Sequence, residues 1–349
     1  MKQEDDLLKM IQSLPDLSSL KELLQKEVRV LDKNNPGADI ALKIQSIING
    51  DQDAVYLNKP YLATTENQRL IGKILPLDAK NVASILGSVD NVFEFVAEGV
   101  GKIHVWDINS LQVAVYHLKR ASILALSPKE YDQFLVDYTS KRFLSNDVFQ
   151  TVKPAIFDES YQNAWDAIFG INPQEDLKKY LFKAIGIDLV KLRYGMPYLK
   201  NKSRYYKVKD ELPKADITIS NGDIVSGILS SSEKFDFIHF SNFLLFAYQL
   251  DCNSDQELFR SKIKQLREVY DNHLNPGGVM LLDYWFGAKA DTLNQYSLDT
   301  ETEELSRKIY QCTYDYLKQD FDLETCPVER VIVGLPDSQD TAIYTKKRK

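Results

Sequence analysis

The residues with the clearest chemical potential follow an apolar run, where Gly87 begins the segment GSVDN at positions 87–91. A glycine directly after a buried strand lets the backbone approach a ligand closely before the next helix begins. Asp107 ends the next apolar run about 20 positions later, the spacing at which an acidic residue holds the ribose hydroxyls of an adenine cofactor. Together these residues predict a site for an adenosine-containing cofactor.

Two further strand ends add polar residues at the same edge. Asp223 follows the third predicted strand, where its carboxylate can accept a hydrogen bond from the adenine amino group. Asn242 follows the fourth predicted strand and is expected to orient cofactor or acceptor. The predicted cofactor-binding residues are Gly87, Ser88, Asp90, Asn91, Asp107, Ile108, Asn109, Gly222, Asp223, Ile224, Ser241 and Asn242.

Most of these residues also have a purely structural interpretation. Gly87 alone is typical of a tight turn. Asp107 and Asp223 are suited to cap the helices that follow them, and Asn242 is suited to cap the helix FLLFAYQL. Both interpretations stay open at this point, and Asp107 can cap a helix and bind a ligand at once.

The charge of the loop after Gly87 discriminates between cofactors. NAD and flavin cofactors place a pyrophosphate over a glycine-rich turn, normally G-x-G-x-x-G, whereas this loop has one glycine and the acidic Asp90. Asp90 would attract the ammonium group of S-adenosylmethionine, and Asn91 would supply a hydrogen-bonding partner. The chain has no G-x-x-x-x-G-K-[ST] segment, which disfavours a P-loop nucleotidase. The sequence therefore favours S-adenosylmethionine.

Short apolar runs alternating with helical stretches must position these residues. A doubly wound sheet places the ends of its parallel strands at one edge, where ligands bind. The C-terminal runs are joined by the turn PDSQD and predict an antiparallel hairpin. The fold predicted is α/β, with a Rossmann-like, mostly parallel sheet of seven strands at 82–86, 102–106, 215–219, 235–240, 278–284, 329–335 and 341–346.

The chain divides into an N-terminal helical region, residues 1–60, and a cofactor-binding domain, residues 61–349. In the first region, apolar residues recur at three-and-four spacing, and Pro15 and NNPG break the pattern into about three helices. The second and third strands lie too far apart for a single crossover helix, which predicts an inserted helical subdomain at about 125–214. Its expected helices are 128–140, 146–152, 158–169 and 174–185, followed by the looser stretch LRYGMPYLKNKSRYYKV. We expect this insertion to form a lid over the acceptor.

The composition excludes several classes of function. The 349 residues include 50 acidic and 43 basic ones, and the net charge of −7 has no basic stripe, which argues against binding nucleic acid. The N-terminus MKQEDDLLKM lacks the pattern of a secretory signal, and no segment reaches the roughly 20 apolar residues of a membrane span, so we expect a cytoplasmic protein. Its three cysteines and four histidines are not at zinc-site spacing, so we expect no metal.

Several short motifs carry a resemblance to a known family. From about residue 60 to the end, the chain resembles bacterial relatives of S-adenosylmethionine:diacylglycerol 3-amino-3-carboxypropyltransferase, an enzyme of betaine-lipid synthesis. The shared motifs are G-S-x-D-[NQ] at 87–91, a glycine at 99 or 101, D-I-N at 107–109, L-K-x-A at 118–121, PYL at 197–199, GD at 222–223, SNFL at 241–244 and NPGG at 275–278.

This resemblance implies that a nucleophile attacks a carbon bonded to the sulfonium of S-adenosylmethionine. A hydroxyl acceptor would be helped by a general base, for which Tyr206, His239 and Glu66 are the candidates, with Asp283 as a further one. Glu66 and its neighbour Asn67 correspond roughly to an acidic pair in the lipid enzymes, which implies contact with the amino-acid arm. His239 is also explained as a buried core histidine, and Tyr206 as a packing residue.

Two further strand ends bear on the acceptor. The fourth strand is followed by Ser241, Asn242 and Phe243 without a proline, unlike the D/N-P-P-Y/F loop of methyltransferases that act on DNA bases or glutamine. The fifth strand ends in aromatic residues, Tyr284, Trp285 and Phe286, which suit either an apolar acceptor site or packing under the lid.

Three functions follow in order of preference. The first is transfer of the 3-amino-3-carboxypropyl group to a hydroxyl or amine acceptor, a small molecule or a lipid, with peripheral membrane contact. The second is methyl transfer from the same cofactor. The third is a Rossmann-like module that binds a ligand or partner without catalysis.

Overall fold

The computed structural model describes residues 61–170, 195–247, 256–285, 301–329 and 339–349, apart from positions 63, 65 and 138. The N-terminal helical region expected at residues 1–60 lies outside this part of the chain, as does the helix expected at 174–185.

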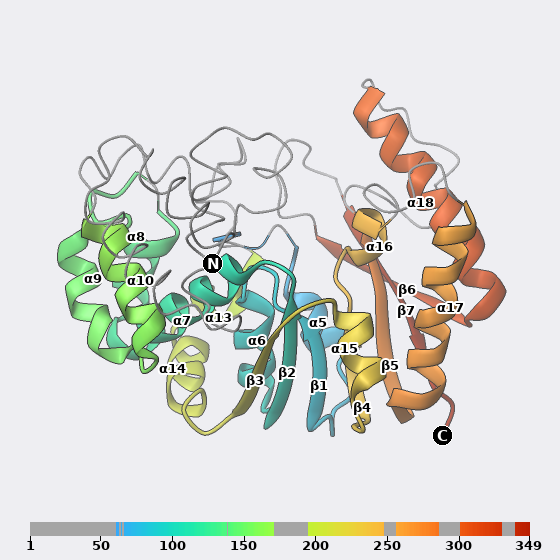
Figure 1. Cartoon of the computed structure of the whole chain (residues 1–349), viewed down its shortest axis with the longest axis horizontal. Helices are drawn as coiled ribbons and strands as arrows, with labels where there is room; N and C mark the ends of the chain where they lie inside the picture. The colour runs from blue at the N-terminus through green and yellow to red at the C-terminus, as the bar shows by residue number, and fades with distance from the viewer. Residues whose placement is uncertain are drawn as a thin grey trace, which may run out of the picture.

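The described residues form one seven-stranded sheet in the order β3-β2-β1-β4-β5-β7-β6 (Figure 1). Strands β1 to β5 are parallel, and β7 lies antiparallel between β5 and β6. The predicted fold class is therefore confirmed. The strands are β1 (Asn81–Ile85), β2 (Lys102–Asp107), β3 (Asp216–Asn221), β4 (Phe235–His239), β5 (Leu274–Trp285), β6 (Leu323–Glu329) and β7 (Gln339–Lys346).

Alternating side chains of the central strands enter two separate hydrophobic cores. Val82 of β1 belongs to one core and Ala83 to the other, as do Leu281 and Leu282 of β5. This period of two is the geometry of a strand with both faces covered, and it explains why the central strands are nearly continuous apolar runs.

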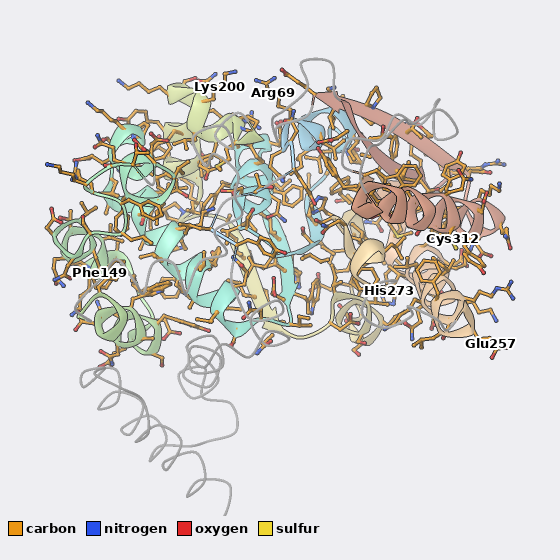
Figure 2. The ribbon with its side chains drawn as sticks, turned by 90° about the horizontal axis from the view of Figure 1, so that it is seen from above. Arg69, Phe149, Lys200, Glu257, His273 and Cys312 are labelled. Carbon is orange, nitrogen blue, oxygen red and sulfur yellow. The ribbon has the colours of Figure 1, made fainter. Side chains whose placement is uncertain are left out.

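Helices cover both faces of the sheet. One core includes α5 (Arg69–Ile74), α6 (Asp90–Glu98), α7 (Ser110–Ala125) and α14 (Lys202–Glu211). The other includes α15 (Ile224–Ser230), α16 (Phe243–Phe246), α17 (Gln256–His273) and α18 (Glu301–Asp320). Figure 2 shows the two layers from above: Arg69 and Lys200 lie on one side, and His273 and Glu257 on the other.

The sixth strand begins earlier than the sequence predicts. The expected strand ERVIVGL spans 329–335, whereas β6 is LETCPVE and begins at Leu323. The remainder of the expected strand lies outside the described part of the chain, as do all residues at 330–338. Among the described strands, β6 pairs with β7 alone, so its outer side tolerates polar residues and Pro327, which cannot donate to a neighbouring strand. An edge strand of this kind lacks the apolar run by which the central strands were recognised.

The insertion is more helical than the sequence suggested. Its described elements are α8 (Pro128–Leu135), α9 (Asn146–Val152), the 3₁₀ turn Lys153–Ala155, α10 (Glu159–Gly170), α13 (Pro197–Lys200) and α14. The stretch expected to be loose forms α13 and α14, because Pro197 occupies the first turn of α13 and Asn201 caps α14 at the backbone N–H groups of Ser203 and Arg204.

The described insertion helices pack against the helices that flank the sheet. Helices α8, α9 and α10 contact α7, and α14 contacts both α6 and α7. In Figure 1, α8, α9 and α10 lie at the left, beside the β3 end of the sheet. The role of the insertion as a lid therefore stays a prediction. None of the described helices is both long enough and apolar enough to span a membrane.

The packing of α15 on β2 gives a first test. A Cβ atom at Gly227 would lie 2.1 Å from Nε1 of Trp106, so Gly227→Ala must displace the indole or the helix. We expect a loss of about 1–3 kcal/mol in the free energy of unfolding, measured by denaturant titration. Gly101→Ala is the matched control, because nothing lies within 4 Å of its added Cβ. Equal effects of the two substitutions would contradict this close packing.

Candidate functional site

The sheet order places a ligand-binding edge beside β1. The chain leaves β1 for β2 and β3 on one side, and continues with β4 and β5 on the other. Ligands of open α/β sheets bind outside the carboxyl ends of the strands at such a switch point. The predicted cofactor-binding residues follow β1, β2, β3 and β4, so the fold brings them to this edge.

The loop after β1 is held in an unusual backbone conformation. Gly87 has a φ of +49° and Val89 a φ of +76°, which a β-branched residue rarely adopts. The N–H of Val89 donates to the carbonyl of Leu86, and the N–H of Leu86 donates to Trp106 on β2. Such conformations cost about 1–3 kcal/mol each and persist where surrounding contacts impose them. The loop is thus shaped by its neighbours before α6 begins.

Asp107 connects this loop to the end of β2. Its Oδ2 accepts a hydrogen bond from the backbone N–H of Gly87 at 3.2 Å, and its Oδ1 accepts one from Asn109 at 2.8 Å. The cap of α7 is Asn109, whose side chain accepts from the N–H of Leu111, so Asp107 is not the helix cap. The side chain of Ile108 is 63% exposed beside them.

The end of β3 lies beside the end of β2, the strand that carries Asp107. The N–H of Gly222 donates to the carbonyl of Asp107, and Gly222 has a φ of +154°. Asp223 caps α15 by accepting from the N–H of Ser226 at 2.8 Å, which is the structural role that the sequence left open. Ile224 is buried in the first turn of α15.

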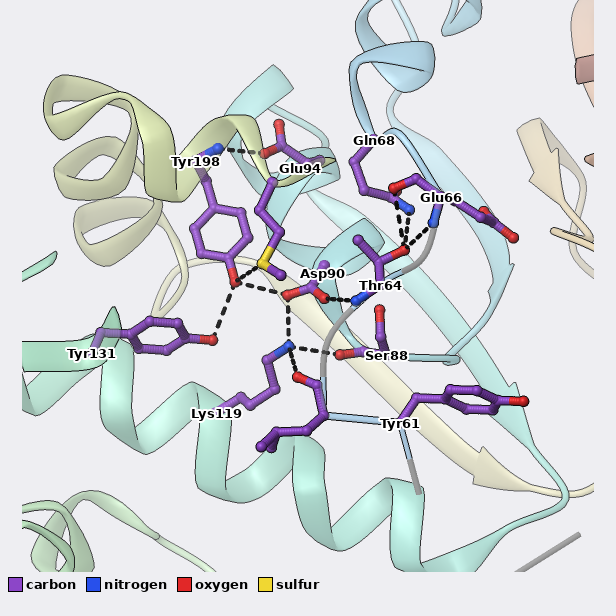
Figure 3. A network of polar contacts seen from close by, with 12 residues as sticks. Tyr61, Thr64, Glu66, Gln68, Ser88, Asp90, Glu94, Lys119, Tyr131 and Tyr198 are labelled. Carbon is purple, nitrogen blue, oxygen red and sulfur yellow. Dashed lines mark hydrogen bonds and ion pairs between the residues drawn. The ribbon is translucent and has the colours of Figure 1, made fainter. Parts of the chain in front are cut away.

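A buried ion pair supports the loop from below (Figure 3). The Nζ of Lys119 donates to Oδ1 of Asp90 at 2.5 Å, to the carbonyl of Ser88 at 2.7 Å and to the carbonyl of Leu62 at 3.1 Å. Neither charged side chain has more than 1% of its surface exposed. Burial lowers the pKa of Lys119, and the nearby Asp90 opposes that shift. The ammonium thus has a full set of three acceptors.

Further groups complete the partners of Asp90. Its Oδ2 accepts from the N–H of Thr64 at 2.9 Å, and its Oδ1 also accepts from the hydroxyl of Tyr198 at 2.7 Å. The hydroxyl of Tyr131 lies 3.1 Å from that of Tyr198. The sequence analysis expected Asp90 to pair with the ammonium group of a ligand. In the structure Asp90 pairs with the ammonium group of Lys119, within the protein.

A second polar cluster lies at the carboxyl end of β4. Ser241 has a φ of +56°, and its hydroxyl donates to Oε1 of Glu66. The Nε2 of His239 lies 3.8 Å from Oε2 of Glu66. Asn242 accepts a longer hydrogen bond from Ser241 at 3.2 Å and makes no side-chain cap of α16. Two of the predicted catalytic residues, Glu66 and His239, are thus brought together.

His239 continues the cluster toward β1. Its Nδ1 lies 2.9 Å from Oγ of Ser84, which also accepts from Nδ2 of Asn91 at 2.8 Å. The same amide nitrogen donates to the carbonyl of Ile85 at 2.7 Å, which leaves the Oδ1 of Asn91 buried without a partner in the described chain. This unpaired acceptor lies in the first turn of α6, next to the loop of Gly87.

Burial perturbs the ionisable groups of this cluster strongly. Burial raises the pKa of Glu66 to about 7, with the Ser241 hydroxyl opposing and Asp340 adding to the shift. Burial lowers the pKa of His239 to about 3, so this imidazole is neutral at pH 7. Burial also raises the pKa of Asp283 to about 8, although Trp285 Nε1 donates to its carboxylate at 2.8 Å. The described residues hold no group of three or more His, Cys, Asp or Glu placed for a metal ion.

The third catalytic candidate, Tyr206, lies elsewhere. It is 38% exposed on α14, beside Lys202. Its neighbour Tyr205 donates to the carbonyl of Leu126, just past the far end of α7. Because α7 begins at the binding edge and rises about 1.5 Å per residue, its 16 residues carry this contact well away from Glu66 and His239.

The aromatic residues after β5 are packing residues where the structure describes them. Tyr284 is fully buried, and its hydroxyl donates to Asp340 at 2.9 Å. Trp285 is fully buried and stacks on Tyr310 of α18 at 5.2 Å between ring centroids. Phe286 lies outside the described residues. The apolar acceptor site expected from Tyr284 and Trp285 is therefore not formed by these two side chains.

Several site residues were missed from the sequence, although each left a signal. Ser84 is the polar residue within the apolar run VASIL, where an unpaired hydroxyl would be costly. Lys119 falls within SLQVAVYHLKRASILA, a helix with few charges, and it belongs to the L-K-x-A motif. Tyr198 belongs to the PYL motif. The partners of these residues come from distant segments, so their roles required the fold.

No protein-family model matches the chain, and no curated protein sequence matches it. Solved structures that resemble it include the N-methyltransferase NodS from Bradyrhizobium japonicum WM9 in complex with S-adenosyl-L-homocysteine, at 11% identity and a TM-score of 0.35 over 90% of this chain and 100% of that one. The rRNA methyltransferase aviRa from Streptomyces viridochromogenes is 11% identical, with a TM-score of 0.36 over 84% and 89%. A precorrin 8w decarboxylase from Methanobacterium thermoautotrophicum is 13% identical, with a TM-score of 0.28 over 80% and 88%.

The buried ion pair predicts a large effect of removing its cation. Lys119→Met leaves the Asp90 carboxylate buried without a counter-charge, and we expect a loss of about 3–5 kcal/mol in unfolding free energy. Lys102→Met is the control, because its pair with Glu233 at 2.7 Å is partly exposed and is expected to contribute about 0–1 kcal/mol. Adding Asp90→Asn to Lys119→Met should recover part of the loss in denaturant titrations. No recovery would show that packing, and not charge, explains the effect.

Proposed function

We propose that this chain is an S-adenosylmethionine-dependent transferase whose cofactor lies across the carboxyl ends of β2, β1 and β4. The observation that carries the proposal is the arrangement of Asp107 and Gly87. The carboxylate at the end of β2 is anchored to the backbone of the loop after β1 by the hydrogen bond from Gly87. A carboxylate fixed in this way is suited to accept hydrogen bonds from a pair of ribose hydroxyls.

The neighbours of Asp107 fit the remainder of an adenosine. Ile108 exposes an apolar side chain directly beside the carboxylate, in a position to cover one face of a purine ring. Asp223 follows the adjacent strand and carries the carboxylate that the sequence analysis assigns to the adenine amino group. A purine ring packed on Ile108 would remove apolar surface of this side chain from water, which is favourable.

The charges at the other end of the edge favour a cationic ligand. Lys119 of α7 supports the loop after β1, and its three acceptors leave its ammonium no hydrogen bond to donate to a phosphate. Asn91 presents a buried oxygen without a partner, and Glu66 adds a carboxyl group. An acceptor-rich edge of this kind suits the sulfonium and ammonium of S-adenosylmethionine better than the pyrophosphate of NAD.

Bound S-adenosylmethionine supplies a carbon already activated by its positive sulfur. The task of this chain's residues is to hold that carbon in line with the acceptor and to take up the acceptor's proton. Glu66 is the suited proton acceptor, because Ser241 fixes one of its oxygens and His239 faces the other. The resemblance to the lipid enzymes supports the 3-amino-3-carboxypropyl group as the group transferred, and a hydroxyl or amine, free or on a lipid, as the acceptor.

Cofactor affinity tests the site directly. Asp107→Asn keeps one acceptor oxygen but loses the charge, so we expect S-adenosylmethionine to bind roughly ten- to a hundredfold more weakly, equivalent to about 1–3 kcal/mol. Asp216→Asn is the matched control, because Asp216 begins β3 at the opposite edge of the sheet and should leave affinity unchanged. Isothermal titration calorimetry measures both. Binding of NAD, with no heat from S-adenosylmethionine, would overturn the proposed cofactor.

The by-product identifies the group transferred. Incubation with S-adenosylmethionine and either diacylglycerol in detergent micelles or a primary amine should release methylthioadenosine, detected by liquid chromatography. Glu66→Gln should slow the release by about 10²–10⁴-fold through loss of the base. S-adenosylhomocysteine as the product would establish methyl transfer instead. Tight cofactor binding without turnover of either acceptor would support a non-catalytic module.

A further inference from the structure

Glu66 is a carboxyl group surrounded by other acids. It is 6% exposed, and the carboxylates of Asp283 on β5 and Asp340 on β7 are both fully buried nearby, close enough for Glu66 to raise the pKa of Asp283 and for Asp340 to raise that of Glu66. Burial of several like charges close together is strongly unfavourable, so at least one such group holds a proton at neutral pH.

The groups that face Glu66 supply no positive charge. From β4 comes His239, which burial keeps neutral, and after it comes the hydroxyl of Ser241. From β5 comes Tyr284, whose hydroxyl donates to Asp340 and so supports that neighbour instead. No lysine or arginine forms an ion pair with Glu66 in the part of the chain that the structure describes. With a pKa near 7, about half of the Glu66 carboxyls carry a proton at pH 7.

The contrast with Asp90 is informative because both carboxyl groups serve the same edge. Asp90 is even more buried, yet its environment supplies an ammonium, a backbone N–H and a phenol hydroxyl. Glu66 has a serine hydroxyl and a neutral imidazole. Among the described residues, the protein therefore stabilises the charge of one carboxylate with an ammonium and places no cation beside the other.

We infer that the missing cation is the sulfonium of the cofactor, so that cofactor binding removes the proton from Glu66 and creates the base that the transfer needs. This inference depends on the proposed function. With the adenosine held at the end of β2, the rest of the molecule extends past β1 toward β4, where Ser241 holds Glu66. A positive charge within about 4–6 Å of a carboxyl group favours its ionised form.

The transfer step that follows conserves atoms and charge. The acceptor's oxygen or nitrogen forms a bond to the cofactor carbon, the carbon–sulfur bond breaks, and its electron pair remains on sulfur as a neutral thioether. The acceptor's proton passes to ionised Glu66. Because the positive charge is now gone, Glu66 is again stable as the protonated acid. Before the cofactor binds, about half of the Glu66 carboxyls are protonated at pH 7 and cannot take up the acceptor's proton, so cofactor binding increases the fraction that can act as the base.

The pair S-adenosylmethionine and S-adenosylhomocysteine tests this inference, because the two share the adenosine and the amino-acid arm and differ in the sulfonium charge. Isothermal titration calorimetry at pH 7, in two buffers of different ionisation enthalpy, gives the number of protons released on binding. We expect about half a proton more to be released with S-adenosylmethionine than with S-adenosylhomocysteine. In Glu66→Gln this difference should vanish while both ligands still bind.

Asp283→Asn identifies the source of the proton. Asp283 is also protonated near neutral pH, but we expect the difference between the two ligands to persist in this variant because the proton leaves Glu66. Loss of the difference in Asp283→Asn with its retention in Glu66→Gln would overturn the inference. Equal proton release by the two ligands in the wild-type protein would overturn it as well, without any variant. Failure of both ligands to bind would instead contradict the proposed function.

Discussion

The buried pair of Lys119 and Asp90 is the interaction on which the arrangement of the site depends. A buried ammonium is tolerated only when its hydrogen bonds are satisfied, and Lys119 meets that requirement with three acceptors from two separate segments. Two of them, the carbonyls of Leu62 and Ser88, are backbone atoms, so satisfying one charge fixes the path of two loops. Asp90 extends the constraint to Thr64. The segment that carries Glu66 and the loop that begins with Gly87 are thereby held together.

The pair of Lys119 and Asp90 also connects the insertion to the loop after β1 that begins with Gly87. Tyr198 of α13 donates to Asp90, and Tyr131 of α8 lies within hydrogen-bonding distance of Tyr198. Glu94 of α6 accepts from the N–H of Tyr198 and pairs with Arg204 of α14 at 2.6 Å. Burial raises the pKa of Glu94 to about 7, while Arg204 opposes the shift. A displacement of α13 would therefore change the partners of the residue that begins α6, which gives the insertion a physical route to the binding edge.

Much of this fold was predictable from the sequence, and the failures have physical reasons. The central strands β1, β2, β4 and β5 contribute side chains to the buried cores, which makes them apolar runs, and Asp107 ends β2 about 20 positions after Gly87. Strand β6 is a half-exposed edge strand and gives no such signal. The acid of the loop, Asp90, was assigned to a ligand because its charge is opposite to that of an ammonium group. Its partner Lys119 lies in α7, beyond α6 and β2, and only the fold places the two in contact. Tyr206 was a candidate by residue type alone, and its position on α14 separates it from Glu66 and His239.

The polar groups at the end of β2 differ from those at the end of β4, and this difference limits which ligands can bind at the carboxyl ends of the strands. At β2, the anchored carboxylate of Asp107 and the exposed Ile108 suit a polar ring with hydroxyl groups and an apolar face. At β4, the hydroxyl of Ser241 fixes one oxygen of Glu66, and the backbone of Ser241 itself has a φ of +56°, a conformation that costs a residue other than glycine about 1–3 kcal/mol. If Glu66 is the base, as we propose, its fixed oxygen cannot move to follow the reacting atom. The carbon attacked would then depend on how the amino-acid arm of the cofactor is seated relative to Glu66, and Asn91, whose Oδ1 has no partner among the described residues, lies in the first turn of α6 beside the loop of Gly87.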